Sequence, residues 1–354
     1  MGSNVARSDR STGGNATELP HEITPRRVAL RGLEVVGFLA VLVLIAALAP
    51  GLGEVRRALS DADLGWIVLG IAFELLSCVS YVLMFGPIFC RRMSWRTSWE
   101  IGWAELGVGS IVPASGAAGV ALGAWVLGRR GMPAERIARR SVAFLLIKSS
   151  VNFIAVAILG ALMAAGLIGP HQSLLLTALP AVLAAGGLAL VLAVPRLGPG
   201  EDPPPDATRP RRWLTSARRA IITGTGEALE IFRSRDPRVV IGAVGYWAWD
   251  NAVLWATFHA VGASVPLSVV LMGYLIGQLG GLLPIPGGVG GIDGGLIGTL
   301  VVYGTPAGVT VAAVLAYRLI LFWLPLVGGI VASVSLRRGL RDMERRDLHD
   351  PARA

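Results

Sequence analysis

The sequence has few charged residues, at 16% of its 354 positions, whereas a soluble domain carries about 25%. It has only two cysteines, Cys78 and Cys90, which are too few for a disulfide framework or a multi-cysteine metal site. Lysine occurs once, as Lys148. A low charge content of this kind excludes an ordinary soluble domain and favours a membrane protein.

The abundant residues are apolar, at 53% of the chain, and the mean hydropathy is +0.63. A helix needs about 20 apolar residues to cross a bilayer. Six apolar runs are long enough, and two other apolar stretches, 98–128 and 267–302, are interrupted by proline and glycine. We therefore expect an all-α polytopic membrane protein with about six full transmembrane helices and two re-entrant helical hairpins. The expected full spans are 30–50, 64–88, 141–168, 174–194, 238–262 and 308–336.

The net charge of +9 comes from arginines in the loops beside these apolar runs. Cytoplasmic loops of membrane proteins are enriched in Lys and Arg, so the charge does not call for nucleic acid as a partner. Placing every arginine-rich loop inside puts both termini in the cytoplasm of a multi-pass plasma-membrane protein. Stretch 98–128 then enters and leaves from the cytoplasmic side, and stretch 267–302 from the outer side.

The expected domain organisation follows from these assignments. Residues 1–27 form a polar, disordered cytoplasmic N-terminus, residues 28–338 form the transmembrane domain, and residues 339–354 form a cytoplasmic tail. The apolar run in the first span is expected to be a retained anchor rather than a cleaved signal peptide. The cytoplasmic loop 195–237 contains an amphipathic helix that we expect to lie on the inner leaflet.

The two interrupted stretches resemble each other. Residues 111–120 match residues 282–291, so that Pro113 pairs with Pro284 and Gly116 with Gly287. Because one copy is expected to open inward and the other outward, the sequence predicts an inverted-topology repeat with halves at about 30–168 and 174–336. Such repeats place a substrate site near the middle of the membrane, between broken helices.

Ionisable residues within the apolar segments are the candidates for that site, since each is costly to place in lipid. An alternative interpretation is that they form structural ion pairs that hold the helices together. The candidates for substrate binding or translocation are Glu74, Glu105, Lys148, Asp250, Asp293 and Arg318.

Proline and glycine supply the second group of candidates. Proline ends a helix, and the following helix start presents free N–H groups that can bind an anion such as a phosphate. Tight packing between helices is the alternative role for such small residues. The candidates of this kind are Pro113 and Gly116 in the first stretch, and Pro284, Pro286, Gly287, Gly288 and Gly290 in the second.

The C-terminal motifs carry a family resemblance. The run LLPIPGGVGGIDGGL at 282–296 is followed by the motifs at 303–306, 316–319 and 322–325. Together they resemble the transmembrane flippase region of lysylphosphatidylglycerol synthases. The resemblance implies movement of a phospholipid or a lipid-linked head group between leaflets, with Asp293 as the acidic and Arg318 as the basic site residue. Many members have Glu at the acidic position, so Asp is a mild departure.

Two-domain members of that family add a soluble aminoacyltransferase domain. This sequence ends at Ala354, and we expect no synthase activity in it. The favoured hypothesis is a lipid flippase that binds a membrane phospholipid or lipid-linked substrate, is not an enzyme, uses no cofactor or metal, and forms a possible homo-oligomer. The alternatives are a secondary transporter of a small soluble solute, a membrane-embedded lipid-modifying enzyme, and a regulatory or assembly subunit.

Overall fold

The computed structural model describes residues 33, 37, 53–111, 117–198, 209–278 and 291–349. The side chains at 117–118, 197, 209–213 and 340–349 are not described. The first expected span, 30–50, therefore lies outside the described residues apart from Leu33 and Gly37. The other five expected spans lie wholly within the described residues.

Every regular element in the described ranges is a helix, as the sequence predicts for an all-α membrane protein. In chain order the elements are α2 (Gly53–Ser60), α3 (Leu64–Phe89), α4 (Trp95–Ile111), α5 (Ala117–Arg129), α6 (Ala134–Ala164), α7 (Leu174–Ala193), the short 3-10 helix η1 (Val194–Leu197), α8 (Arg209–Arg233), α9 (Pro237–Ala260), α10 (Leu267–Gly277), α11 (Gly291–Val302) and α12 (Ala307–His349).

Four of these described helical segments are long and apolar enough to cross a membrane, namely Leu64–Phe89, Ala134–Ala164, Leu174–Arg196 and Ala307–Gly339. They match four of the expected spans. The fifth expectation, 238–262, forms α9, which has 24 residues but is less apolar because tryptophans, Asp250 and Asn251 lie within it. Helix α9 nevertheless packs along α3 more extensively than any other described pair of helices packs.

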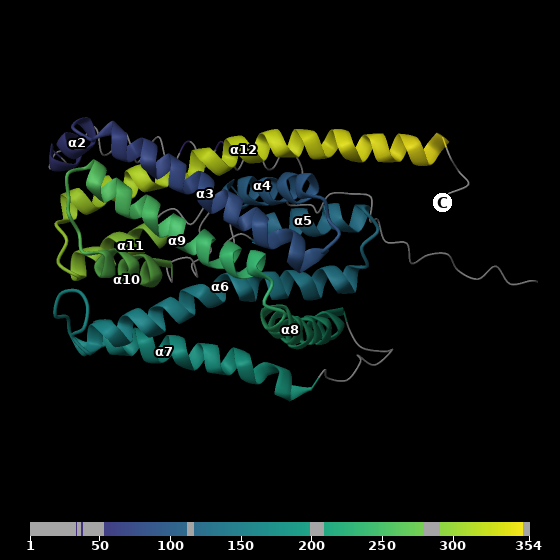
Figure 1. Ribbon diagram of the computed structural model, residues 1–354, viewed down its shortest axis with the longest axis horizontal. Coiled ribbons are helices and arrows are strands. Elements are labelled where there is room, and N and C mark those ends of the chain that lie inside the picture. The colour runs from purple at the N-terminus through teal and green to yellow at the C-terminus, as the bar shows by residue number, and fades with distance from the viewer. Residues whose placement is uncertain are drawn as a thin grey trace, which may run out of the picture.

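The interrupted stretches form two pairs of short helices. Helices α4 and α5 contact each other, and so do α10 and α11. Figure 1 shows the longer helices running roughly along the long axis of the molecule, with α10 and α11 near one end and α4 and α5 toward the other. The two short pairs therefore occupy opposite halves of the bundle.

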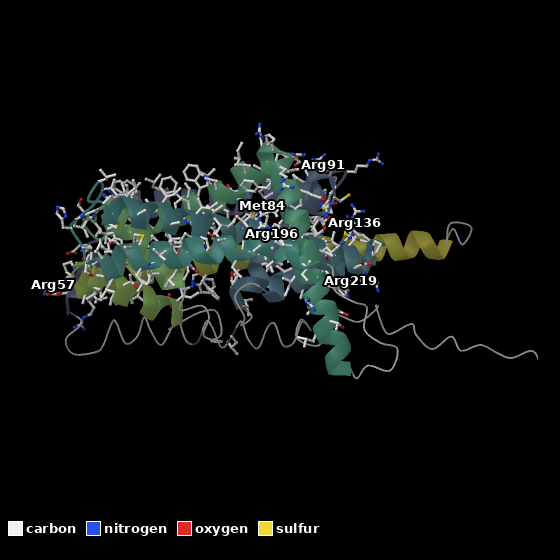
Figure 2. All side chains as sticks on the ribbon, turned by 90° about the horizontal axis from the view of Figure 1, so that it is seen from below. Arg57, Met84, Arg91, Arg136, Arg196 and Arg219 are labelled. Carbon is white, nitrogen blue, oxygen red and sulfur yellow. The ribbon has the colours of Figure 1, made fainter. Side chains whose placement is uncertain are left out.

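Helix α8 runs across the bundle rather than along it, as Figures 1 and 2 together show. It packs on α6, where Glu227 forms a 2.6 Å ion pair with Arg140. Its Leu214, Ile221 and Phe232 side chains are exposed. An apolar face exposed on a transverse helix supports the expectation of an interfacial helix, which remains a prediction.

The arginines gather at one end of the bundle. In Figure 2, Arg91, Arg136 and Arg219 lie at the end where α8 crosses, and Arg57 lies at the opposite end. We call the first of these the arginine-rich end. Helix α2, which carries Arg57, contacts the beginning of α12 through Val55 and Ala312.

The two short helix pairs are followed by equivalent turns. Gly131 before α6 and Gly304 before α12 have positive φ angles of 84° and 99°. In the first turn the Met132 N–H bonds to the Leu127 carbonyl at 3.0 Å, and in the second the Thr305 N–H bonds to the Leu300 carbonyl at 3.1 Å. Both turns are Schellman motifs, in which glycine is favoured because it adopts positive φ readily. A proline, Pro133 or Pro306, then immediately precedes each long helix.

Helices α4 and α12 approach so closely that their backbones touch. A Cβ atom added at Gly329 would lie 2.6 Å from the Cα of Gly107, and one at Gly328 would lie 2.1 Å from the Trp103 ring. Small residues at such positions let helices associate through close van der Waals packing. The glycines therefore hold the first short helix pair against the last long helix.

This contact predicts that Gly329→Ala lowers thermal stability, since overpacking of a tight contact costs about 1–3 kcal/mol. The matched control is Gly339→Ala on the same helix, where an added Cβ meets nothing within 4 Å. The control should leave the melting temperature unchanged or raise it, because alanine is the better helix former. Melting temperatures of the two detergent-solubilised variants check this, and equal values would contradict the close contact.

Candidate functional site

The six ionisable residues predicted from the sequence are all described, and each comes from a different helix. They are Glu74 on α3, Glu105 on α4, Lys148 on α6, Asp250 on α9, Asp293 on α11 and Arg318 on α12. The predicted proline and glycine candidates Pro113, Gly116, Pro284, Pro286, Gly287, Gly288 and Gly290 lie outside the described residues.

Glu105 lies between the two helices of the first short pair and is 2% exposed. Its Oε2 accepts a 2.7 Å hydrogen bond from the Tyr81 hydroxyl. The carboxylate lies directly against Gly123 of α5, where a Cβ atom would be 1.6 Å from Oε1. Gly123 is therefore needed to leave room for the acid. Among the described residues Oε1 has no hydrogen-bond partner.

Asp250 is the second buried acid bound by tyrosine. The Tyr274 hydroxyl donates to its Oδ2, and the Tyr317 hydroxyl donates to its Oδ1 at 3.1 Å. Two phenolic donors satisfy both carboxylate oxygens, as a buried acid requires.

The two acid–tyrosine pairs are related to each other. Tyr81 on α3 is 24 residues before its partner Glu105 on α4, and Asp250 on α9 is 24 residues before its partner Tyr274 on α10. Each pair joins the helix before a short helix pair to the first helix of that pair. The acid follows the phenol in the first pair and precedes it in the second.

Two cations, Lys148 and Arg318, lie with the buried acids and tyrosines. We call these groups together the polar centre. The Lys148 Nζ lies 5.8 Å from the centre of the Tyr81 ring and 5.7 Å from that of Tyr246, within the range of cation–π attraction. The Arg318 Nε forms an ion pair with Asp293 Oδ1. This pair joins the first turn of α11 to α12.

A cavity of about 220 Å³ is lined by some of these groups. Lys148, Asp250 and Arg318 line it from three helices. The other polar groups on its wall are Asn152, Tyr246, Tyr274, Gln278 and Tyr317. Such a cavity offers two cationic donors and one carboxylate, that of Asp250, to a polar ligand, and Asp293 adjoins it through Arg318.

The two remaining acids are placed differently. Glu105 reaches this group indirectly, because Tyr81 contacts both Glu105 and Lys148. Glu74 is 5% exposed, and its Oε1 accepts a 3.6 Å hydrogen bond from the Cys78 thiol. Its Oε2 has no hydrogen-bond partner among the described residues. Neither Glu74 nor Glu105 lies on the cavity wall.

Sequence reasoning missed the tyrosines. Tyr81, Tyr246, Tyr274 and Tyr317, four of the five in the chain, contact the buried acids or Lys148. The available signal was their position inside apolar spans, where a hydroxyl group needs a partner. Within the described parts of the chain, no three His, Cys, Asp or Glu side chains come together as a metal site would require.

The curated relatives of this chain are described as UPF0104 membrane proteins of Methanothermobacter thermautotrophicus. One is 38% identical over 104 residues, which is 28% of this chain and 30% of that protein. A second is 31% identical over 88 residues, or 25% of this chain and 26% of the relative. These matched regions cover only about a third and a quarter of the two relatives. A third match is 23% identical over 326 residues, covering 85% of this chain and 93% of that protein.

The family comparison covers most of the chain. The protein-family model described as the lysylphosphatidylglycerol synthase TM region matches residues 34–329. This range includes the six ionisable residues of the site, from Glu74 on α3 to Arg318 on α12. The protein is a multi-pass membrane protein, and it belongs to the family of the lysylphosphatidylglycerol synthase transmembrane region.

Proposed function

We propose that this protein moves a phospholipid or a lipid-linked head group between the two leaflets of the plasma membrane, without changing it chemically. The observation that carries the proposal is the cavity lined by Lys148, Asp250 and Arg318 among otherwise apolar helices. Charged groups at this depth are expensive and mark the paths of polar substrates. A head group with a phosphate and further polar atoms would match the mixed lining.

The cavity size favours a head group over a whole lipid. Its volume of about 220 Å³ is below the 300–1,000 Å³ or so of sites that enclose a drug-sized ligand. In this mechanism the head group crosses through the polar centre while the acyl chains stay in the bilayer. The same volume would also suit a small soluble solute, so the transport assay must include one.

The arrangement of the short helix pairs supports alternating access. In our proposal, α4–α5 and α10–α11 are re-entrant hairpins that enter from opposite membrane faces. The placement of these pairs in opposite halves of the bundle supports this (Figure 1). The matching Schellman turns and the two acid–tyrosine pairs support an inverted-topology repeat. In this proposal the arginine-rich end lies in the cytoplasm, and both chain termini are expected there as well.

The ion pair between Asp293 and Arg318 is the first target for a test. We expect Asp293→Asn and Arg318→Ala to reduce transbilayer movement at least about tenfold, because each removes a charged partner of the polar centre. The measurement is leaflet sidedness of labelled phospholipids with several head groups in vesicles containing the purified protein.

A matched control is available at the surface. Asp236 and Arg238 form a 2.9 Å ion pair in the first turn of α9, where the Asp236 carboxylate also caps the helix. Asp236→Asn is isosteric and asparagine caps helices well, so it should leave transport unchanged. Equal transport in wild type, Asp293→Asn and Arg318→Ala would remove the pair from the mechanism. Uptake of a soluble solute without lipid movement would replace the proposal by secondary transport.

The two acid–tyrosine pairs yield a second prediction. Double-mutant cycles of Tyr81→Phe with Glu105→Gln, and of Tyr274→Phe with Asp250→Asn, should each give a favourable coupling of about 1–3 kcal/mol. A cycle of Tyr303→Phe with Glu105→Gln is the control and should be close to additive, because the Tyr303 hydroxyl bonds to the Leu176 carbonyl and not to the acid. Stability against denaturant in micelles measures all three. No coupling in the first two cycles would contradict the assigned hydrogen bonds.

A further inference from the structure

A second polar site lies at the arginine-rich end, on the outside of the helix bundle. A groove of about 810 Å³ runs between α4, the end of α5 and the last part of the apolar span of α12. Three guanidinium groups, those of Arg96, Arg130 and Arg338, and one carboxylate, that of Glu100, line it. The groove therefore carries an excess of positive charge.

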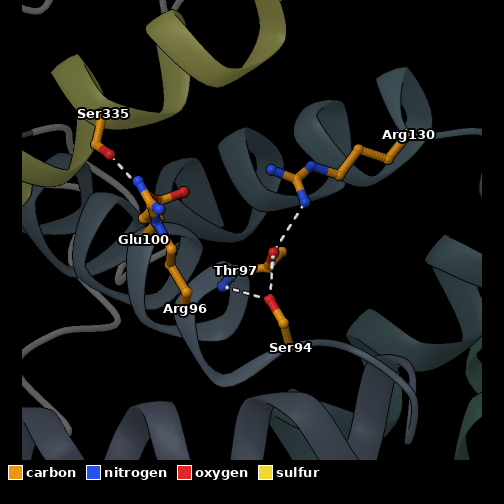
Figure 3. A network of polar contacts seen from close by, with 6 residues as sticks. All are labelled: Ser94, Arg96, Thr97, Glu100, Arg130 and Ser335. Carbon is orange, nitrogen blue, oxygen red and sulfur yellow. Dashed lines mark hydrogen bonds and ion pairs between the residues drawn. The ribbon is translucent and has the colours of Figure 1, made fainter. Parts of the chain in front are cut away.

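Hydrogen bonds within the groove fix the geometry of its base (Figure 3). The Arg130 Nη1 donates to Thr97 Oγ1 at 2.9 Å, and the Ser335 hydroxyl donates to Glu100 Oε1 at 2.7 Å. Glu100 also pairs with Arg96 at 3.1 Å. The single acid is thus already bound by two partners on its Oε1, so it neutralises only part of the positive charge.

Arg130 has one N–H group, at Nε, that donates no hydrogen bond to the described residues. Its Nε is buried and has no hydrogen-bond partner among the described residues. A buried donor without a partner is unfavourable, and this N–H can reach a ligand in the groove only if the Arg130 side chain moves. Arginine presents its donors in a planar fork that matches the oxygens of a phosphate.

The wall of the groove beside these arginines is apolar and exposed. Ile330, Val331 and Val334 of α12 are 57%, 67% and 44% exposed. Ile330, Val334 and Arg338 follow one another at four-residue spacing, so they lie on one face of the helix. Arg338 lies eight residues beyond Ile330, which is about 12 Å along the helix axis. The apolar span of α12 ends at Gly339, one residue beyond Arg338.

From these observations we infer that the groove binds one anionic phospholipid of the leaflet at the arginine-rich end. Arg130 and Arg338 bind the phosphate at the level where the apolar span ends. The acyl chains lie along Ile330, Val331 and Val334, which otherwise face the bilayer. The charge excess selects an anionic lipid over a zwitterionic one.

The other arginine-lined pocket at this end does not have the same properties. There Arg91, Arg92, Arg136 and Arg140 are opposed by the three acids Glu227, Glu230 and Asp236. Arg140 is already held by Glu227 and by the Ile88 carbonyl. The charges of this pocket are largely balanced within the protein. The groove of α4 and α12 is therefore the better anion site.

This inference deepens the proposed function, because it assigns the head-group class and a docking place for a lipid. It does not require that the lipid crosses the membrane. Binding is measured in micelles, which have no leaflets. A protein that binds the lipid but fails to transport it would refute the proposed function and leave this site intact.

The test measures binding of dioleoylphosphatidylglycerol to the detergent-solubilised protein by native mass spectrometry. Arg338→Ala and the double variant Arg130→Ala/Arg338→Ala should weaken binding by about tenfold or more, because each removes a charged donor from the phosphate. Dioleoylphosphatidylcholine should bind more weakly than the anionic lipid to the wild type. Arg338 is exposed, so its single variant keeps the test valid if the double variant misfolds.

The matched control is Arg92→Ala. Arg92 is also an exposed arginine at the same end, but it lines the balanced pocket, so its removal should leave lipid binding unchanged. Equal weakening by Arg92→Ala would show a general charge effect and overturn the site. Unchanged binding in Arg338→Ala would overturn it too, as would displacement of the lipid by millimolar inorganic phosphate, which would indicate a free-anion site.

Discussion

The structure depends on the cost of placing an ionisable group among apolar helices. Each such group costs about 2.5–3.5 kcal/mol on insertion, and more when a buried polar atom has no partner. This cost is lowered when the groups meet one another. Asp250 is bound by two phenols, and Asp293 by Arg318. Because these partners come from different helices, satisfying the charges also fixes how α9, α10, α11 and α12 pack.

Two acid–tyrosine pairs lower this cost with the same two kinds of group in opposite chain order. Tyr81 and Asp250 each lie 24 residues before their partners, Glu105 and Tyr274. Each short helix pair is therefore joined to the preceding helix by one acid and one phenol, but the acid lies on α4 in the first case and on α9 in the second. The centre is accordingly asymmetric in charge although the backbone turns at Gly131 and Gly304 are alike. A polar substrate would meet different groups on its two sides.

The sequence predicts the helices well because their apolar length is a local property. The spans at α3, α6, α7 and α12 follow from composition alone, and the ionisable candidates could be identified because a charge within an apolar run is conspicuous. The partners could not be assigned, because a hydrogen bond such as Tyr317 to Asp250 joins residues 67 apart. The groove around Arg130 was also missed, since arginines near a membrane end are explained by topology alone.

The glycine contact between α4 and α12 has a mechanical consequence. With the Gly107 and Gly329 backbones in direct contact, there is no intervening side chain to deform, and the bulky Trp103 ring beside Gly328 blocks sliding along the helix axis. Any movement of α4 against α12 must then pivot at this point. In a rigid helix, Arg96 at one end and Ile111 at the other would swing in opposite directions. Rotation about the Gly107–Gly329 contact is therefore the relative movement of these two helices that meets the least steric hindrance.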